Sequence, residues 1–340
     1  MYTWDMGRRK KIHTELRKSD IVREITSALA DEAKAVAFLE KYRWGSTPTC
    51  AHCDSTNVYQ MNDVSGHRTK RLLWRCRTCG KQYTVRVGTV MEHSHIPLRF
   101  WVYAIWQVVS CKKGVAALQI KRHTQITYRA ALFLLNRLRH GFAHASDVIA
   151  KLDEIVEADE TYVGGKPRKK GVSKRGRGTK KIPVFAVVQR YGNVRAQVVA
   201  SINGETLKGA LKKMVSPTAI VLTDDLNSYH GLGKHFEAHH SVNHSAKEYA
   251  REWPGKPPKA AKGDSLHSNT IESFFSLIKR GVMGIFHNIS PKHLHRYVDE
   301  FAWRYNIRTL NDGDRTVSAI QSMIGSRLMY RVPKMAVELG

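Results

Sequence analysis

Acidic residues are scarce in this sequence. The chain of 340 residues contains 29 Asp and Glu against 56 Lys and Arg, which leaves a formal net charge of +27 at pH 7. A surplus of this size opposes folding through self-repulsion unless a polyanion neutralises it. Nucleic acid is the leading candidate for that polyanion, and its binding should weaken steeply as the salt concentration rises. A membrane surface is disfavoured, because no segment combines a basic face with a bare apolar side.

Long apolar runs are also missing. The longest, Phe100 to Val109, is interrupted by Tyr and Gln and falls short of the ~18 residues expected of a membrane-spanning helix. The N-terminus is polar and basic and lacks the apolar core of a signal peptide. We therefore expect a cytoplasmic, nucleoid-associated protein with no membrane partner. Hydrophobic residues make up 42% of the chain and charged residues 25%, which is the balance of a globular protein.

Cysteine is limited to five residues, four of which form two tight pairs. Cys50 and Cys53 make one C-x-x-C pair, Cys76 and Cys79 make the other, and 22 residues separate the pairs. An odd count with this spacing argues against a disulfide framework and favours metal binding in a reducing compartment. Four thiolates that converge from two turns predict a closed, structural zinc site. A redox pair is the weaker alternative.

Residues 93–148 have the pattern of helices. A short helix over Val115–Arg122, a tight turn and a longer helix over Tyr128–Arg139 resemble a helix-turn-helix, which would place the second helix against DNA. The residues expected to be exposed on that second helix are Tyr128, Arg129 and Arg137. An ordinary helical hairpin remains the alternative, because such patterns are common.

From Glu154 onward the pattern changes to alternating strands. The expected elements are strands at Ile155–Asp159, Ile182–Gln189 and Asn193–Ala200, a helix at Gly204–Met214 and a strand at Ala219–Asp224. Three successive strands, a helix and a further strand is the order of a ribonuclease-H-like α/β domain. The sequence therefore predicts that fold for residues 149–312.

A basic insertion at residues 166–181 separates the first two of these strands. Nine of its sixteen residues are Lys or Arg and none is acidic. With its glycines and serine it is expected to be a flexible arm that becomes ordered, if at all, on a phosphate backbone. The residues proposed as DNA contacts are Lys169, Lys170, Lys174 and Arg175. A merely solvated loop is the alternative.

Three acids fall at the ends of core elements: Asp159, Asp224 and Glu272. Asp159 and Asp224 lie on the first and fourth strands, which are neighbours in a ribonuclease-H-like sheet, so their carboxylates should be close. Phosphodiester cleavage uses hard oxygen ligands of this kind to hold two Mg²⁺ ions about 3.5–4 Å apart. Glu157 shares the strand face of Asp159, and Asp225 adjoins Asp224, so the residues alone leave these two alternatives open.

A helix is expected over His267–Gly281, with Ser268 or Asn269 as its N-cap. The seven positions from Glu272 to Lys279 correspond to about two helical turns, which places both side chains on one face. On an isolated helix a solvated charge pair is the simpler interpretation. The acids upstream favour a metal ion at Glu272 and a phosphate at Lys279.

The chain resembles the DDE insertion-sequence transposases that carry an N-terminal zinc ribbon, the ISXO-type, Merlin-related group. The shared motifs lie in order over roughly residues 25 to 310. They are the two C-x-x-C pairs, Glu157-Ala-Asp159-Glu-Thr-Tyr-Val-Gly-Gly165, Thr223-Asp224, His267-Ser-Asn269-Thr-Ile-Glu272, Lys279-Arg280-Gly281 and Gly284-Ile-Phe-His287. This resemblance implies that Asp159, Asp224 and Glu272 form a metal-binding triad for two Mg²⁺ or Mn²⁺ ions.

The resemblance also implies roles for the neighbours of this triad. Lys279, with Arg280 beside it, would position DNA near the cleavage site. Asn269 is a possible further metal ligand, because some members of the group use an asparagine there. The sequence departs from the group at Asp225, where a glycine is common after the second aspartate.

An insertion-sequence transposase would bind the double-stranded DNA of its terminal repeats, hydrolyse phosphodiesters and join the freed 3′-hydroxyl to target DNA. Joining two ends implies a homodimer or larger assembly on DNA. A catalytically silent DNA-binding regulator and a nuclease without joining activity are the alternatives. The expected divisions are a basic N-terminal arm and helix at 1–44, the zinc ribbon at 45–92, the helix-turn-helix-like region at 93–148, the catalytic domain at 149–312 and a C-terminal helical tail at 313–340.

Overall fold

The structure is a computed structural model of the chain. It describes residues 18–147, 149–164, 181–242, 248, 250–261 and 263–328. Most of the basic insertion, with its four proposed DNA contacts, therefore lies outside the described residues. The chain divides into two compact units, one comprising residues up to Cys111, Ala117–Phe142 and Leu310 onward, the other Lys112–Ala116 and Ala143–Thr309. We call them the helical unit and the sheet unit. The finer five-part division stays a prediction.

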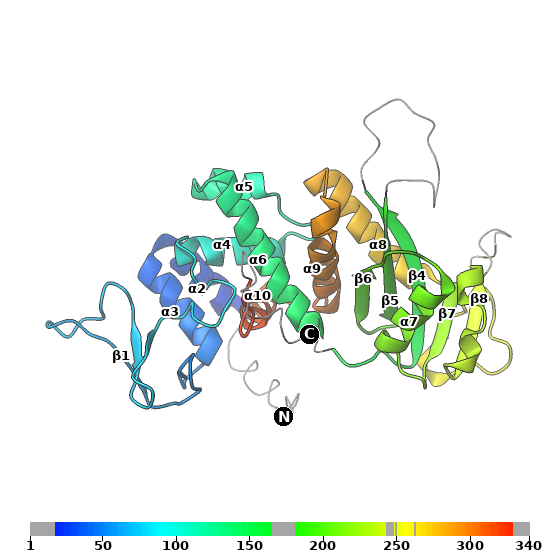
Figure 1. Ribbon diagram of the computed structural model, residues 1–340, viewed down its shortest axis with the longest axis horizontal. Coiled ribbons are helices and arrows are strands. Elements are labelled where there is room, and N and C mark those ends of the chain that lie inside the picture. The colour runs from blue at the N-terminus through cyan, green and yellow to red at the C-terminus, as the bar shows by residue number, and fades with distance from the viewer. Residues whose placement is uncertain are drawn as a thin grey trace, which may run out of the picture. The chain divides into compact units, whose positions relative to one another are not determined.

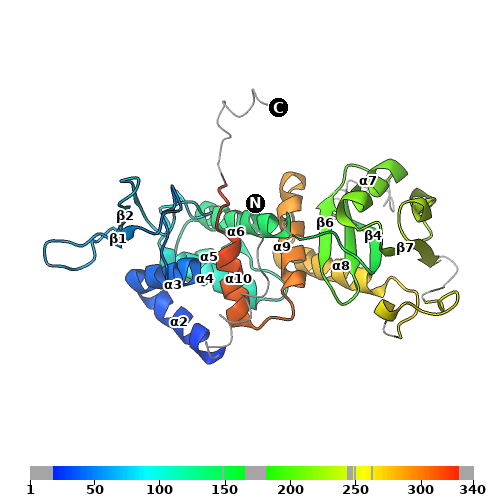
Figure 2. The same ribbon diagram turned by 90° about the horizontal axis from the view of Figure 1, so that it is seen from below.

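The helical unit contains a group of packed helices. They are α2 (Lys18–Ala30), α3 (Glu32–Trp44), α4 (Leu98–Ser110) and α10 (Asp312–Ser322), which lie together in Figure 2. Local sequence starts two of these helices: the Asp31 side chain accepts from the backbone of α3, and that of Asn311 from the backbone of α10. Within the described residues no helix has the length and apolar character to cross a membrane.

A small three-stranded sheet belongs to the same unit. Its antiparallel strands, in order, are β1 (Val58–Gln60), β2 (Trp74–Cys76) and β3 (Gln82–Tyr83). Glu40 of α3 anchors this sheet, because its carboxylate accepts from Arg68 at 2.9 Å and from the Trp74 indole at 2.8 Å. The buried core here is only a few residues, including two of the four paired cysteines. Such a small core needs additional stabilisation.

The helix-turn-helix-like segment forms α5 (Ala117–Thr124) and α6 (Tyr128–Asp147). Thr127 caps α6, because its hydroxyl accepts from the Ala130 N–H at 3.2 Å. The prediction that Arg137 is exposed is wrong: it is buried, and its guanidinium donates to the carbonyls of Val90 at 2.9 Å and Glu92 at 2.8 Å. The guanidinium serves to hold the neighbouring loop. The helices exist, and a DNA-binding role for them stays a prediction.

The sheet unit is built on five strands: β4 (Ile155–Val163), β5 (Ile182–Gln189), β6 (Val194–Val198), β7 (Ile220–Asp224) and β8 (Ala238–Val242). Their order is β6-β5-β4-β7-β8. The pairs from β6 to β4 are antiparallel, whereas β4 with β7 and β7 with β8 are parallel. The first strand of the unit therefore lies at the centre beside the fourth. This is the ribonuclease-H-like arrangement expected from the sequence.

Helices cover both faces of this sheet, as Figure 1 shows. α7 (Gly204–Met214) packs on one face, and α8 (Asn269–Gly281) and α9 (Leu294–Asn306) pack on the other. Side chains alternate along β4, so Val156 and Ala158 face α7, and Glu157 and Asp159 point to the opposite face. Short helices complete the unit: Asn227–Tyr229, Leu232–Lys234, Lys259–Ala261 and Pro291–His293 are 3₁₀-helices, and Val282–Phe286 is a π-helix that follows α8.

The far end of α8 lies very close to α9. A β-carbon added at Gly281 would come within 2.2 Å of the Phe301 ring and 3.1 Å of the Lys113 carbonyl oxygen. Phe301 is buried, so its ring has little room to move. Glycine is therefore required for this approach of the two helices.

Candidate catalytic and metal sites

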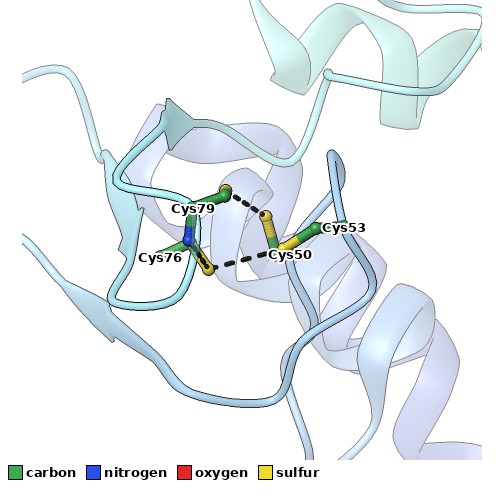
Figure 3. Close-up of side chains that lie close together, drawn as sticks. All are labelled: Cys50, Cys53, Cys76 and Cys79. Atoms are coloured by element: carbon green, nitrogen blue, oxygen red, sulfur yellow. Dashed lines mark hydrogen bonds between the residues drawn. The ribbon is translucent and has the colours of Figure 1, made fainter.

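The four paired cysteines converge in the ribbon, as Figure 3 shows. The sulfur atoms of Cys50 and Cys79 are 3.7 Å apart, as are those of Cys53 and Cys76, and all four lie within 4.8 Å of one another. A tetrahedron with zinc–sulfur bonds of about 2.3 Å has sulfur–sulfur edges of about 3.8 Å. The distances therefore fit one zinc ion and are far too long for disulfide bonds.

Backbone N–H groups at the two turns point at these sulfur atoms. The N–H of His52 donates to Cys50 Sγ and that of Cys79 to Cys76 Sγ, both at 3.4 Å. The Cys79 N–H is the main cause that lowers the pKa of Cys76 to about 6. The pKa of Cys53 is instead raised: a Ser55 backbone hydrogen bond lowers it, but burial and the other three cysteines outweigh that bond. A thiolate at neutral pH is the form that binds a metal ion. The ribbon thus presents a structural zinc site of the kind the spacing predicts.

The three predicted acids come to the same face of the large sheet. The parallel register pairs Glu157 with Leu222, and two residues further along each strand lie Asp159 and Asp224. Glu272 lies in the first turn of α8, on the helix that covers this face. The fold therefore brings together residues that are far apart in the sequence.

The electrostatics of Asp159 reflect the charges of the acids around it. Burial, followed by the negative charges of Glu160 and Asp224, raises the pKa of Asp159 to about 8, and Glu272 contributes in the same direction. A carboxylate with this environment favours a cation beside it. Among the residues that the structure describes, only the four cysteines have at least three candidate ligand atoms within 4.8 Å of one another. The three acids do not form such a group, so their role as metal ligands stays a prediction.

Glu157 has the opposite environment, although it lies on the same strand face as Asp159. Its side chain is fully buried, and its carboxylate accepts from Arg190 Nε at 2.9 Å and from the backbone N–H groups of Thr270 at 2.8 Å and Ile271 at 3.0 Å. Burial raises its pKa, but hydrogen bonds led by those of His267 and Arg190 outweigh burial and hold the pKa below its ordinary value. The charge of Glu157 is satisfied within the protein, which favours Asp159 over Glu157 as the metal ligand.

The remaining alternatives near the triad are resolved in part. Asp225 is exposed just after β7, and the pKa of Asp159 responds to Asp224, which favours Asp224. Ser268 occupies the N-cap position of α8 but forms no side-chain capping bond. Asn269 is exposed at the first position of the helix, where its role as a metal ligand stays a prediction.

Lys279 and Arg280 are both exposed near the end of α8. Arg280 lies back along the helix, because its guanidinium donates to the Ser276 carbonyl at 3.2 Å and hydroxyl at 3.0 Å. In the helical unit, Tyr128 is 48% exposed and Arg129 is also exposed. These four side chains are accessible, as a contact to a phosphate backbone requires.

Sequence reasoning missed two residues that shape this site. The Tyr229 hydroxyl donates to Glu160 Oε2 at 2.6 Å, and the Glu160 N–H donates to Asp159 Oδ1 at 2.7 Å. Tyr229 is fully buried on a short helix after β7. Its position beside Glu160 follows from the fold, and the only sequence signal was the adjacency of Glu160 to Asp159.

Comparison with known families gives this geometry a context. Residues 151–306 match the model of the ISXO2-like transposase domain, and residues 30–82 match the transposase zinc-ribbon domain. The two matches together span more than half of the chain and include both groups of candidate ligands. The chain belongs to the ISXO2-like transposases with an N-terminal zinc ribbon.

A curated relative supports this assignment. The chain is 26% identical over 290 residues to an uncharacterised protein in transposable element ISH50 of Halobacterium salinarum, covering 81% of this chain and 91% of the relative. The Mos1 strand transfer complex matches with 13% identity and a TM-score of 0.30, covering 64% of this chain and 73% of that one. A Mos1 mariner paired-end complex with Mn matches with 14% identity and a TM-score of 0.21, over 62% of this chain and 74% of that one. Because both scores are low, the fold assignment rests on the strand order of the sheet.

Proposed function

We propose that this ISXO2-like transposase binds the double-stranded terminal repeats of its element, cleaves phosphodiester bonds with divalent metal ions and joins the freed 3′-hydroxyl to target DNA. The observation that carries the proposal is the environment of Asp159. Its half-buried carboxylate lies near the charges of Glu160, Asp224 and Glu272, an arrangement that is costly in a purely structural role and useful around a cation.

Asp159, Asp224 and Glu272 would hold two Mg²⁺ or Mn²⁺ ions, because carboxylate oxygens are the ligands that these hard cations prefer. When bound, the ions activate the attacking hydroxyl and stabilise the leaving oxygen. Asn269, at the start of α8, would add an amide oxygen. Glu160 would hold Asp159 in position through its backbone N–H, and Tyr229 would in turn hold the Glu160 carboxylate.

The DNA would be held by basic and aromatic side chains outside the metal site. Lys279 and Arg280 lie on the helix that carries Glu272 and would contact phosphates near the scissile bond. Tyr128 and Arg129 of α6 and the basic insertion would contact other phosphates of the DNA. The net charge of +27 supplies the long-range attraction for such a partner. The zinc ribbon would add a rigid DNA-contacting or protein-contacting module.

The test compares wild-type protein with the Glu272→Gln variant on labelled terminal-repeat DNA in Mg²⁺ or Mn²⁺. We expect cleavage and strand transfer by the wild type, and loss of both by the variant with end binding retained. Cleavage by the Glu272→Gln variant at the wild-type level would contradict the assignment of Glu272 as a ligand of the catalytic ions. End binding without cleavage by either protein would favour the silent regulator, and cleavage without joined products would favour the nuclease.

A band-shift titration of the same DNA tests the assembly. Two end-containing duplexes in one complex are expected, with at least two protein chains, because strand transfer joins two ends. The affinity should fall steeply between low and physiological salt. A complex of one chain with one duplex at all protein concentrations would contradict the proposed homodimer.

A further inference from the structure

The first turn of α8 is held by a carboxylate from a distant strand. Helices α3, α7 and α10 begin at a local capping side chain, respectively Asp31, Asn203 and Asn311. In α8 the residue at that position, Ser268, forms no such bond. The first amides of α8 are satisfied instead by Glu157, which is 113 positions earlier in the chain.

The Glu157 carboxylate accepts hydrogen bonds from α8 and from Arg190. Glu157 Oε2 accepts from the N–H groups of Thr270 and Ile271, and Oε1 accepts from the Thr270 hydroxyl at 2.9 Å. Arg190 of the segment after β5 pairs with the same carboxylate and also donates to the carbonyls of Ser265 at 2.9 Å and His267 at 3.0 Å. A carboxylate buried with this many donors is ionised and rigid.

The contact lies between two of the proposed metal ligands, Asp159 and Glu272. Glu157 precedes Asp159 by two residues, or about 7 Å along the strand. The amide of Ile271 immediately precedes Glu272 in the helix. A local cap would accept hydrogen bonds from the first N–H groups of α8 without attaching the helix to the sheet. Glu157 instead links β4, which carries Asp159, to α8, which carries Glu272.

We propose that Glu157 is a positioning residue that sets the separation of the Asp159 and Glu272 carboxylates by holding the first turn of α8 against β4. Arg190 also contributes, because it binds the carbonyls of Ser265 and His267 in the segment that precedes α8. Glu157 acts through these backbone contacts and does not itself bind the metal ion. The inference rests on the proposed function, since it concerns the geometry of the same metal site.

The test uses full-length, zinc-loaded protein with Glu157→Gln. An amide of the same shape must point its NH₂ group at one of the surrounding donors, which loosens the contact without removing volume. Hydrogen–deuterium exchange should accelerate about tenfold or more in the first turn of α8. The Mn²⁺ concentration for half-maximal binding, followed by the electron paramagnetic resonance signal of free Mn²⁺, should rise about 10- to 100-fold.

The matched control is Glu32→Gln. Glu32 holds the start of α4 in a similar way, accepting from the N–H groups of Leu98 at 2.6 Å and Arg99 at 3.1 Å, but in the helical unit. This variant should leave both Mn²⁺ binding and exchange in α8 unchanged. Thr270→Val, which removes one hydroxyl bond, should shift the Mn²⁺ midpoint about threefold and serves if Glu157→Gln does not fold.

The outcomes separate this inference from the proposed function. A wild-type Mn²⁺ midpoint in Glu157→Gln, or in a folded Thr270→Val when Glu157→Gln does not fold, would overturn the positioning role. Weakened Mn²⁺ binding with unchanged exchange in α8 would also overturn it, because Glu157 would then act as a ligand. If Glu272→Gln also binds Mn²⁺ and cleaves as the wild type does, the proposed metal site itself fails.

Discussion

The two candidate metal sites of this protein are built in opposite ways. In the ribbon, Cys50 and Cys79 are 29 positions apart, and the four thiols form a closed cluster with sulfur–sulfur distances that match a tetrahedral ion. In the sheet unit, the three acids Asp159, Asp224 and Glu272 lie on β4, β7 and α8. These elements are distant in the sequence and are brought to one face of the sheet by the tertiary fold. We expect the ribbon, whose buried core is only a few residues, to need its ion in order to fold, and the sheet, with its large apolar core, to fold without one.

Because of this difference, we expect the zinc site to determine the stability of the ribbon and the acids to determine the cleavage activity. The ribbon has few buried apolar residues, so removing a ligand should unfold it. The acids of the sheet oppose one another in the absence of a cation, so removing one should spare the fold and abolish the reaction. Substitutions at the two sites should therefore change different measurements, and the following experiments test that separation in order of expected effect.

The largest effect is expected from Cys76→Ser. Loss of one thiolate should remove the zinc ion and unfold the ribbon, because zinc contributes about 10–16 kcal/mol in isolated finger peptides. Metal analysis should find about one zinc per chain in the wild type and almost none in the variant. Cys111→Ser is the control, since Cys111 lies outside the cluster. Zinc retained at the wild-type level in Cys76→Ser would contradict the four-thiolate site.

The next effect concerns Asp159→Asn. Cleavage should fall by about 10³-fold or more, because a metal ligand is lost. In zinc-loaded protein without added Mg²⁺ or Mn²⁺, the thermal unfolding temperature should stay the same near pH 7, where a carboxyl with a pKa of about 8 is largely protonated. It should rise above pH 8, where the substitution removes a charge that Glu160, Asp224 and Glu272 repel. Calorimetry and the cleavage assay measure the two quantities on one sample. A strongly destabilised Asp159→Asn would show that this carboxylate is structural.

A moderate effect is expected from Gly281→Ala at the far end of α8. The added methyl group would meet the Phe301 ring, and overpacking of this kind costs about 1–3 kcal/mol. The sheet unit should therefore unfold at lower denaturant concentration with zinc content unchanged. Gly209→Ala on α7 is the control, because a β-carbon there meets no atom within 4 Å. Equal stability of the two variants would contradict the close packing of α8 on α9.

The smallest effect is expected from Arg129→Ala in α6. Each phosphate contact contributes about 0.9 to the slope of log affinity against log salt, so the slope should fall by about that amount with little change in protein stability. Arg137→Ala is the contrasting variant: Arg137 is buried and holds the loop at Val90 and Glu92, and its loss should destabilise the helical unit. An unchanged salt slope in Arg129→Ala would remove α6 from the DNA-binding surface.

The sequence predicted the parts of this structure whose signals are local. The C-x-x-C pairs, four strands of the large sheet and helix α8 give signals within short windows, and each is found near its expected position. The first strand was predicted to end at Asp159, but β4 continues to Val163, so Asp159 lies within the strand. The strand β8 was missed because Ala238-His-His-Ser-Val242 lacks an apolar alternation, and its pairing with β7 determines its conformation. Arg137 was misplaced for a similar reason, since a charged residue on a helix gives no local sign that backbone carbonyls surround it.

The choice between Glu157 and Asp159 shows the same limit at the site. The two acids share one strand face and are indistinguishable by spacing. Their difference arises from Arg190, Thr270 and Ile271, which satisfy one carboxylate and not the other. Such partners are defined by tertiary contacts, so a sequence window around β4 contains no trace of them.

The ratio of cleavage rates in Mn²⁺ and Mg²⁺ for an Asp224→Cys variant tests the central claim most directly. A thiolate is a poor ligand for the hard Mg²⁺ ion and a better one for the softer Mn²⁺ ion. Asp224→Cys should be inactive on terminal-repeat DNA in Mg²⁺ and recover cleavage in Mn²⁺, while Asp224→Ala should be inactive in both. Wild-type cleavage by Asp224→Cys in Mg²⁺ would contradict the account, because Asp224 would then not be a ligand of the catalytic ions.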